Sequence, residues 1–216
     1  MSRKFTVIDA EQRSPEWFSA RLGRITGSRA ADMMAPLNKD KSEKACRRNL
    51  RVQLALERIT GRSCERDYQN DHMQYGVVTE PEAFAAYESL TGRMLQRSGF
   101  LQHTELMAGT SLDAHVGDYE GIVEIKCPIP ATHLDYLKTG TVPSDYLWQV
   151  THSLWVTGAA WCDWMSYAKE FPEHIQAKLV RVNREDVDLA AYELAVRLFL
   201  SEVEKEVSAV ASLAVA

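Results

Sequence analysis

The stretch "SLDAHVGDYEGIVEIKCP", residues 111–128, combines an apolar strand pattern with charged side chains. Its second half alternates, so Glu124 and Lys126 fall on one face of a strand, with Val123 and Ile125 on the other. The apolar residues predict a strand that packs beneath helices. Because a carboxylate is costly to bury without a partner, the two charged residues on such a strand indicate a functional site.

Asp113 supplies a second carboxylate close to Glu124. The two residues are eleven positions apart, a spacing that a hairpin between two strands can close. Two converging anionic oxygens suit Mg²⁺ or Mn²⁺, which prefer oxygen ligands and retain waters. Lys126 would lie on the same face as the glutamate and could hold or deprotonate a water during attack on a phosphodiester. The stretch therefore predicts a metal-dependent hydrolytic site.

The composition is that of an ordinary globular protein. The chain has 216 residues, of which 45% are hydrophobic and 25% charged, enough for one domain with a substantial core. It contains no run of about eighteen apolar residues, so no membrane span is expected. The first dozen residues lack the apolar core of a secretion signal. We therefore expect a cytoplasmic protein without a membrane partner.

The cysteines and histidines do not form the common zinc-binding patterns. The four cysteines are widely scattered without a CxxC spacing, and the six histidines form no HExxH pattern. The cysteines are therefore expected to be reduced thiols and not a zinc site or a disulfide framework. They are Cys46, Cys64, Cys127 and Cys162.

Charge is unevenly distributed along the chain. The net charge is −5, yet residues 1–66 hold 15 Lys and Arg against 8 Asp and Glu, whereas the remainder holds 10 against 22. This asymmetry permits one face that attracts phosphate and another that holds cations or faces solvent. A basic segment in the first part could be a solvated helix face. We favour a second interpretation, in which it approaches a DNA backbone without sequence preference. Its residues are Lys39, Lys41, Lys44, Arg47, Arg48 and Arg51.

Helix signals dominate both ends of the chain. Ser14 is placed to cap a helix that starts at Pro15, and Asn183 to cap the final amphipathic helix. Pro81 lies inside an otherwise helical pattern and predicts a break or a new start. Helices are predicted over residues 14–23, 27–35, 71–90, 131–138, 143–157 and 183–207, with one more that ends before Gly61.

Strand signals fill the centre of the chain. Three strand-like runs lie between Met94 and Lys126, and further strands are predicted over 159–168 and 176–182. Because no linker or repeat divides the sequence, we predict one α/β (α+β) domain with a central mixed β-sheet flanked by helices. The single domain would span residues 1–216, with a helical part over about 1–92, a catalytic sheet over about 93–182 and a C-terminal helix over about 183–207.

Four sequence blocks resemble known nuclease motifs. The pattern "SLD…EIKCP" resembles the D-x(n)-E-x-K signature of the PD-(D/E)xK superfamily, whose core is restriction-endonuclease-like. "WFSARLGRITGS", residues 17–28, is similar to the W-x(3)-R-x-G-x-I-T-x-S motif of the phage lambda exonuclease family. "YGVVTEPEAFAAYESLTG", residues 75–92, resembles that family's helix with an additional acidic residue. "YLWQVTHSLWVTG", residues 146–158, is similar to its Q-V-x(2)-S-x-W-V-T segment. The blocks occur in the family's order.

This resemblance implies roles for residues around the D, E and K positions. Asp113, Glu124 and the backbone carbonyl of Ile125 would bind the metal. Glu80 would add a further carboxylate, either as a direct ligand or behind the ligands. Lys126 would position the attacking water.

The resemblance also implies a pocket that grips the 5′-phosphate of a duplex end. Arg21, Ser28, Ser111 and Gln149 would form it. Trp17 lies one helical turn before Arg21 in the sequence and would pack beside it.

The family implies a metal-dependent exonuclease that degrades one strand of linear double-stranded DNA in the 5′-to-3′ direction. It would start at 5′-phosphorylated ends and leave 3′ single-stranded overhangs for recombination by strand annealing. The implied cofactor is Mg²⁺, for which Mn²⁺ would substitute. The implied partners are linear duplex DNA, a single-strand annealing protein and two further copies of the chain in a homotrimeric ring. If phage-encoded, the protein would act in the host cytoplasm.

Other interpretations remain open from the sequence. Asp113 could only shape a turn, Glu124 could form a buried ion pair with Lys126, and Glu80 could be a first-turn helix acid. The family often has S-P-D where this chain has Leu112 before the aspartate, which we interpret as loop variation. The rival functions are an endonuclease on the same core, of the restriction or branched-DNA type, and a catalytically silent DNA-binding recombination scaffold.

Overall fold

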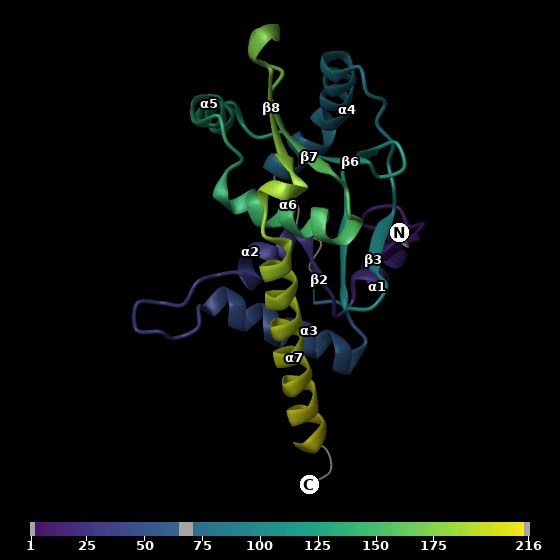
Figure 1. Ribbon diagram of the computed structural model, residues 1–216, viewed down its shortest axis with the longest axis vertical. Coiled ribbons are helices and arrows are strands. Elements are labelled where there is room, and N and C mark those ends of the chain that lie inside the picture. Colours follow the sequence, from purple (N-terminus) through teal and green to yellow (C-terminus); the bar gives the residue numbers. More distant parts are fainter. Residues whose placement is uncertain (1–2, 65–70, 214–216) are drawn as a thin grey trace.

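Two four-stranded mixed sheets, with helices packed around them, form the part of the chain described by the computed structural model, residues 3–64 and 71–213 (Figure 1). The first sheet has the order β1-β3-β4-β2 and the second the order β5-β6-β7-β8. The predicted α/β class is confirmed, with two sheets in place of one central sheet. The first sheet comprises β1 (Phe5–Ile8), β2 (Ile25–Thr26), β3 (Phe100–His103) and β4 (Ala108–Ser111). The second comprises β5 (Ala114–Val116), β6 (Gly121–Lys126), β7 (Trp161–Tyr167) and β8 (Ala177–Asn183).

The two sheets meet where the chain passes directly from β4 to β5. Only Leu112 and Asp113 separate the two strands. Leu112 is buried in the core, which anchors the crossing point. The side chain of Asp113 is therefore held at the junction of the sheets, next to the last residue of the first sheet, Ser111.

The helices lie close to their predicted positions. Ser14 caps the first helix, since its hydroxyl accepts a hydrogen bond from the Trp17 N–H at 3.1 Å. Gly61 ends the third helix in the left-handed conformation, with a φ of 66°. The helices are α1 (Pro15–Arg21), α2 (Ala30–Met33), α3 (Ala45–Thr60), α4 (Asp71–Thr91), α5 (Pro130–Thr139), α6 (Ser144–Thr157) and α7 (Leu189–Leu213). The 3₁₀ turns are η1 (Gly27–Arg29), η2 (Glu173–Ile175) and η3 (Arg184–Asp186).

Two local expectations are wrong. Helix α4 continues through Pro81 without a break, because Ala83 and Tyr87, in the turns that follow, are fully buried against the second sheet and hold it together. Asn183 caps the 3₁₀ turn η3 and not the final helix. Asp188 caps α7 instead, accepting a hydrogen bond from the Ala191 N–H at 2.9 Å. Tertiary packing overrides the helix-breaking signal of Pro81. At Asn183, the 3₁₀ turn η3 comes between the predicted cap and the final helix.

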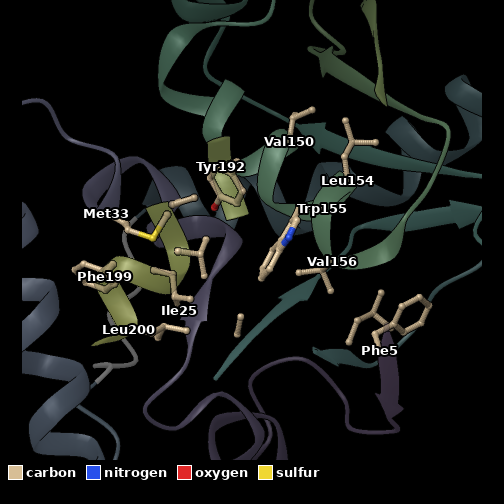
Figure 2. Packing of buried hydrophobic residues seen from close by; sticks show 14 of the residues in the cluster. Phe5, Ile25, Met33, Val150, Leu154, Trp155, Val156, Tyr192, Phe199 and Leu200 are labelled. Atoms are coloured by element: carbon tan, nitrogen blue, oxygen red, sulfur yellow. The ribbon is translucent and has the colours of Figure 1, made fainter. Parts of the chain in front are cut away.

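The core gathers on the two faces of the second sheet. The larger cluster joins both sheets to α2, α3, α6 and α7, and Figure 2 shows Trp155 and Tyr192 at its centre. The smaller cluster packs α4 against Val123 and Ile125 of β6. Helix α4 thus covers one face of β6, which leaves the opposite face, with Glu124, to α6. Within the described ranges, no helix has both the length and the apolar character needed to cross a bilayer.

His152 of α6 joins three elements in the larger cluster. One ring nitrogen lies 2.7 Å from the hydroxyl of Tyr192 on α7, and the other lies 3.0 Å from the carbonyl of Gly109 on β4. The side chain is fully buried, and burial lowers the pKa of His152 to about 4. The imidazole is therefore neutral in the folded protein at neutral pH.

We expect His152 to make the fold sensitive to acid. Its pKa is about 6.5 in the unfolded chain and about 4 in the folded one, so the folded state binds fewer protons between these values. The free energy of unfolding should therefore fall by roughly 3 kcal/mol as the pH drops across this window. In urea unfolding at pH 7 and pH 4.5, His152→Gln should be less stable at pH 7 but lose this part of the pH dependence. The exposed His174, changed to Gln, is the control and should behave like the unsubstituted protein.

Helix α3 is tied to α7, which it crosses in the lower part of Figure 1, by ion pairs. Arg47 lies 2.7 Å from Glu202 of α7, and Arg51 lies 3.1 Å from Glu206 of the same helix. Both arginines also pair with Glu43. For these two residues the expected approach to a DNA backbone is wrong, because carboxylates brought by α7 neutralise their charge. The same expectation for Lys39, Lys41, Lys44 and Arg48 stays a prediction.

Candidate active site

Strand β6 carries two charged residues on the face of the second sheet opposite α4. Glu124 is only 3% exposed. Its Oε1 accepts hydrogen bonds from the Lys126 ammonium and, at 2.6 Å, from the amide of Gln149 on α6. A buried carboxylate with two donors is tolerated, whereas an unpaired one is not. The expected ion pair between Glu124 and Lys126 therefore exists, within a larger arrangement.

Asp113 is brought to the same place by the β5–β6 hairpin. The antiparallel register pairs Ala114 with Val123, which sets Asp113 opposite Glu124. Oδ2 of Asp113 accepts a hydrogen bond from the Ile125 N–H at 2.6 Å. In a strand the N–H and C=O of one residue point to the same side, so the Ile125 carbonyl also faces the side of Asp113. The predicted convergence of these groups is thus present.

The negative charges of Asp113 and Glu124 together favour the binding of a cation. Burial and the nearby charge of Glu124 raise the pKa of Asp113 to about 7, although Lys126 opposes the shift. Burial works against the charge of Lys126, but the carboxylates of Glu124 and Asp113 outweigh it and raise the pKa of the ammonium. A second positive charge beside Asp113 would relieve the repulsion between the carboxylates.

The donor set fits a hard divalent cation. It offers two carboxylates and one backbone carbonyl, and Mg²⁺ commonly takes one or two carboxylates and keeps several waters. Among the described residues, no three His, Cys, Asp or Glu side chains gather closely enough to hold a metal ion by themselves. Asp113, Glu124 and the Ile125 carbonyl are the groups that would hold the ion.

Glu80 lies near this group but is held by another partner. It projects from α4 and forms an ion pair of 2.7 Å with Arg97. Its charge still contributes to the raised pKa of Asp113. Glu80, Arg97 and Asp113 line one cavity of about 650 Å³, a size in the range of ligand pockets. The structure thus places Glu80 beside the predicted metal site and not as a third member of a ligand cluster.

The residues expected to bind a 5′-phosphate form a neighbouring group. Arg21 is buried and stacks on Trp17, with its guanidinium carbon 4.0 Å from the ring centre. The indole N–H of Trp17 donates to the hydroxyl of Ser111 at 2.9 Å. Ser111 lies two residues before Asp113. The contacts from Arg21 through Trp17 to Ser111 therefore lead to the carboxylate site.

Thr26 connects the remaining members to Arg21. Its hydroxyl lies 3.5 Å from an Arg21 nitrogen and 3.4 Å from the hydroxyl of the exposed Ser28. Gly27, between them, lies against Gln149 of α6, since a Cβ at Gly27 would come 3.5 Å from the Gln149 side chain. The structure thus brings together all five predicted residues, although it gives Gln149 a direct bond to the carboxylate site.

The sequence did not single out two residues that belong to this site. Tyr146 lies below Lys126, with the ammonium 5.2 Å from its ring centre. It precedes Gln149 by three positions on α6, and this spacing on one helix face was a usable signal. Arg97 comes from an irregular segment before β3 and gave no periodic signal.

Comparison with known proteins identifies the family of the chain. A family model described as a YqaJ-like viral recombinase domain matches residues 16–160, more than half of the chain. The chain belongs to the YqaJ-like viral recombinase family. The match runs from within α1 to just beyond α6, and it includes all ten residues of the two predicted sites. It also includes Arg97, the partner of Glu80. No protein of curated function matches the sequence.

Solved structures place this member of the YqaJ-like family beside exonucleases. LHK-Exo, an alkaline exonuclease from Laribacter hongkongensis, matches with a TM-score of 0.82 and 36% identity, over 94% of this chain and 98% of that chain. LHK-Exo in complex with dAMP gives a TM-score of 0.83 at the same identity and coverage. A phage-related exonuclease from Haemophilus somnus 129PT matches with a TM-score of 0.65 over 88% of this chain and 95% of that chain. At 14% identity it supports the fold alone. The resemblance stated from the motifs is confirmed.

Proposed function

We propose that the chain is a metal-dependent 5′-to-3′ exonuclease that digests one strand of linear double-stranded DNA. The observation that carries the proposal is the convergence of Asp113, Glu124 and Lys126 next to the Arg21–Trp17–Ser111 group. One group suits a divalent cation, and the other suits a terminal phosphate. Family membership and the likeness to an alkaline exonuclease support the same assignment.

The residues of the site have separable tasks in this reaction. A bound Mg²⁺, or Mn²⁺ in its place, would supply activation of water and stabilisation of the leaving oxygen. Asp113, Glu124 and the Ile125 carbonyl would hold the ion. The ammonium of Lys126 would orient the attacking water and balance the anionic charge that builds up on the phosphodiester. Glu80 would lie beside the metal ligands and add its negative charge to the site.

The direction of strand degradation and the requirement for a free DNA end test the proposal. With Mg²⁺, linear duplex carrying a label at either end should lose nucleotides from its 5′ ends and retain 3′ overhangs, whereas covalently closed duplex should stay intact. Equal attack on linear and closed DNA would instead identify an endonuclease. No release with either Mg²⁺ or Mn²⁺ would identify a silent DNA-binding scaffold.

Arg21→Ala should remove the preference for phosphorylated ends. The buried guanidinium is fixed by Trp17 and supplies the charged donors of the predicted phosphate pocket. On 5′-phosphorylated duplex the rate should fall by about 10–100-fold, corresponding to the loss of one charge-assisted contact, and on 5′-hydroxyl duplex it should change little. Arg24→Ala, on the neighbouring turn, is the control. A variant that loses activity equally on both ends would show that Arg21 does not bind the phosphate.

The finer biological setting belongs to the same proposal. The 3′ overhangs would be passed to a single-strand annealing protein for recombination, and three copies of the chain would form a ring around the duplex. The free cysteines support a reducing compartment, which we take to be the cytoplasm. Sedimentation should give the mass of three chains. A stable monomer with full processive activity would contradict the ring.

A further inference from the structure

Two arginines meet at the turn between α1 and β2. Arg24 lies on this turn, and Arg58 reaches it from the last turn of α3. The stem of Arg58 passes directly over Gly23, where a methyl group would come 2.6 Å from the Arg58 Cγ. Because Gly23 has no side chain, the Nε of Arg58 can donate to the Gly23 carbonyl at 3.0 Å. The fold therefore holds the Arg58 guanidinium beside Arg24.

The guanidinium of Arg58 has a buried donor that no protein group uses. Its Nη1 pairs at 3.2 Å with Glu204 of α7, a carboxylate that is 66% exposed. Its Nη2 is buried and has no hydrogen-bond partner among the residues that the structure describes. A buried donor without an acceptor is costly, and more so when it is charged. The position therefore favours a ligand that brings an acceptor oxygen.

Arg24 adds a second positive charge at the same place. Its Nε donates to the Ala20 carbonyl at 3.1 Å. Burial and the charge of Arg58 both lower the pKa of Arg24, as expected for like charges held close together. Burial also lowers the pKa of Arg58, although Glu204 opposes the shift. An anion bound by both guanidinium groups would relieve their repulsion.

The buried carboxylate of Glu57 is close to this turn but is engaged by other donors. Its Oε2 accepts the Gly23 N–H at 2.8 Å. Its Oε1 accepts the Cys64 N–H at 3.0 Å and the Gln53 amide at 3.2 Å. Glu57 thus fixes the shape of the turn and does not fill the place beside the arginines.

We infer that Arg24 and Arg58 form a second phosphate-binding site, separate from the predicted pocket that contains Arg21. Guanidinium groups bind phosphate through paired N–H donors, and the half-exposed Arg24 leaves the site open to solvent. The phosphate would come from the DNA backbone behind the 5′ end or from free inorganic phosphate. The first source rests on the proposed function, because the Arg24 N–H donates to the Arg21 carbonyl at 3.0 Å and the two sites are neighbours. The second source does not depend on it.

Calorimetric binding of inorganic phosphate, with a chelator and at constant ionic strength, tests the site without DNA. Arg21→Ala removes the charged donors of the predicted 5′-phosphate pocket, and this variant should still bind one phosphate. Adding Arg24→Gln to it should weaken the binding by about 10–100-fold, the loss of one charge-assisted contact. The matched control is Arg197→Gln on α7, whose charge is paired with Glu193 at 2.7 Å, and it should leave the affinity unchanged.

Glu204→Gln gives a second readout with the opposite sign. The exposed carboxylate competes with an anion for Arg58, so its removal should tighten phosphate binding by about 2–5-fold, in line with the small contribution of an exposed ion pair. A variant that folds poorly would not gain affinity.

Binding of duplex DNA in a chelator distinguishes the two sources of phosphate. For a backbone phosphate, Arg24→Gln should weaken binding equally on 5′-phosphorylated and 5′-hydroxyl duplex. The slope of log affinity against log salt should also fall in magnitude by about 1. This equal effect leaves the preference for phosphorylated ends intact, so Arg24 still serves as the control for Arg21. An unchanged slope together with weakened phosphate binding would identify free inorganic phosphate as the ligand.

Two results would overturn the site. One is equal phosphate affinity with and without Arg24→Gln in the Arg21→Ala protein, and the other is weaker binding in Glu204→Gln. If the unsubstituted protein releases no nucleotides from linear duplex, the proposed function fails. The phosphate measurements would still decide whether Arg24 and Arg58 form a binding site.

Discussion

Lys126→Ala is expected to reduce nucleotide release from linear duplex by about 10²–10⁴-fold, the usual contribution of a positioned proton-transfer or water-orienting group. The ammonium is held on the face of β6 opposite α4 by Glu124 and by the ring of Tyr146, so the substitution removes the positive charge at this position. Binding of DNA ends should be largely retained, because the phosphate group of residues is separate. The measurement is single-turnover release from 5′-phosphorylated duplex, together with end binding in a chelator.

The exposed Lys138 provides the matched control for this substitution. It lies on α5, is two-thirds exposed, and pairs with the exposed Asp135. Lys138→Ala should therefore retain full activity. An active Lys126→Ala variant would remove Lys126 from the mechanism, whereas a loss of both activity and end binding would indicate a structural role.

Asp113→Asn should abolish cleavage and, at the same time, stabilise the metal-free protein. The pKa of Asp113 is about 7 in the folded protein and about 3.9 in the unfolded chain. Between these values the folded state binds more protons, so the contribution of this group to stability is lost as the pH rises toward 7. At pH 8 the folded protein bears the full cost of a charged Asp113 beside Glu124. Asparagine removes the charge and can still accept the Ile125 N–H.

Urea unfolding with a chelator checks this prediction. At pH 8 Asp113→Asn should be more stable by roughly 1–3 kcal/mol, and the difference should vanish below about pH 3, where the carboxyl is neutral in both states. Added Mg²⁺ should stabilise the unsubstituted protein but not the variant, because only the former keeps the ligand. Asp118→Asn, on the exposed turn of the same hairpin, is the control and should show neither effect. A destabilised Asp113→Asn variant at pH 8 would contradict the assigned repulsion.

These two substitutions address one physical property of the site. The fold holds two carboxylates close together in a partly buried place, and a bound cation would compensate the energy that this costs. Residues selected for such a task reduce the stability of the metal-free state, which is why the loss of function and the gain of stability are expected together in Asp113→Asn.

Several elements of the fold followed from local chemistry. Ser14 with Pro15 determined the start of α1, and Gly61 determined the end of α3, since capping and the left-handed conformation depend on neighbouring residues alone. Alternation along β6 correctly separated Glu124 from the face covered by α4. Pro81 was misjudged because the packing that keeps α4 continuous comes from the second sheet, far away in the sequence.

The sequence by itself predicted a site of two carboxylates and a lysine at hairpin spacing, and it determined the family through motif blocks in the family's order. Only the tertiary structure decided their partners. Gln149 reaches Glu124, Arg97 holds Glu80, and α7 neutralises two arginines that looked free to bind DNA. The physical reason is the range of the forces. Caps and strand alternation act over a few residues, whereas a buried charge is compensated by whichever donor the packing of distant elements brings within about 3 Å.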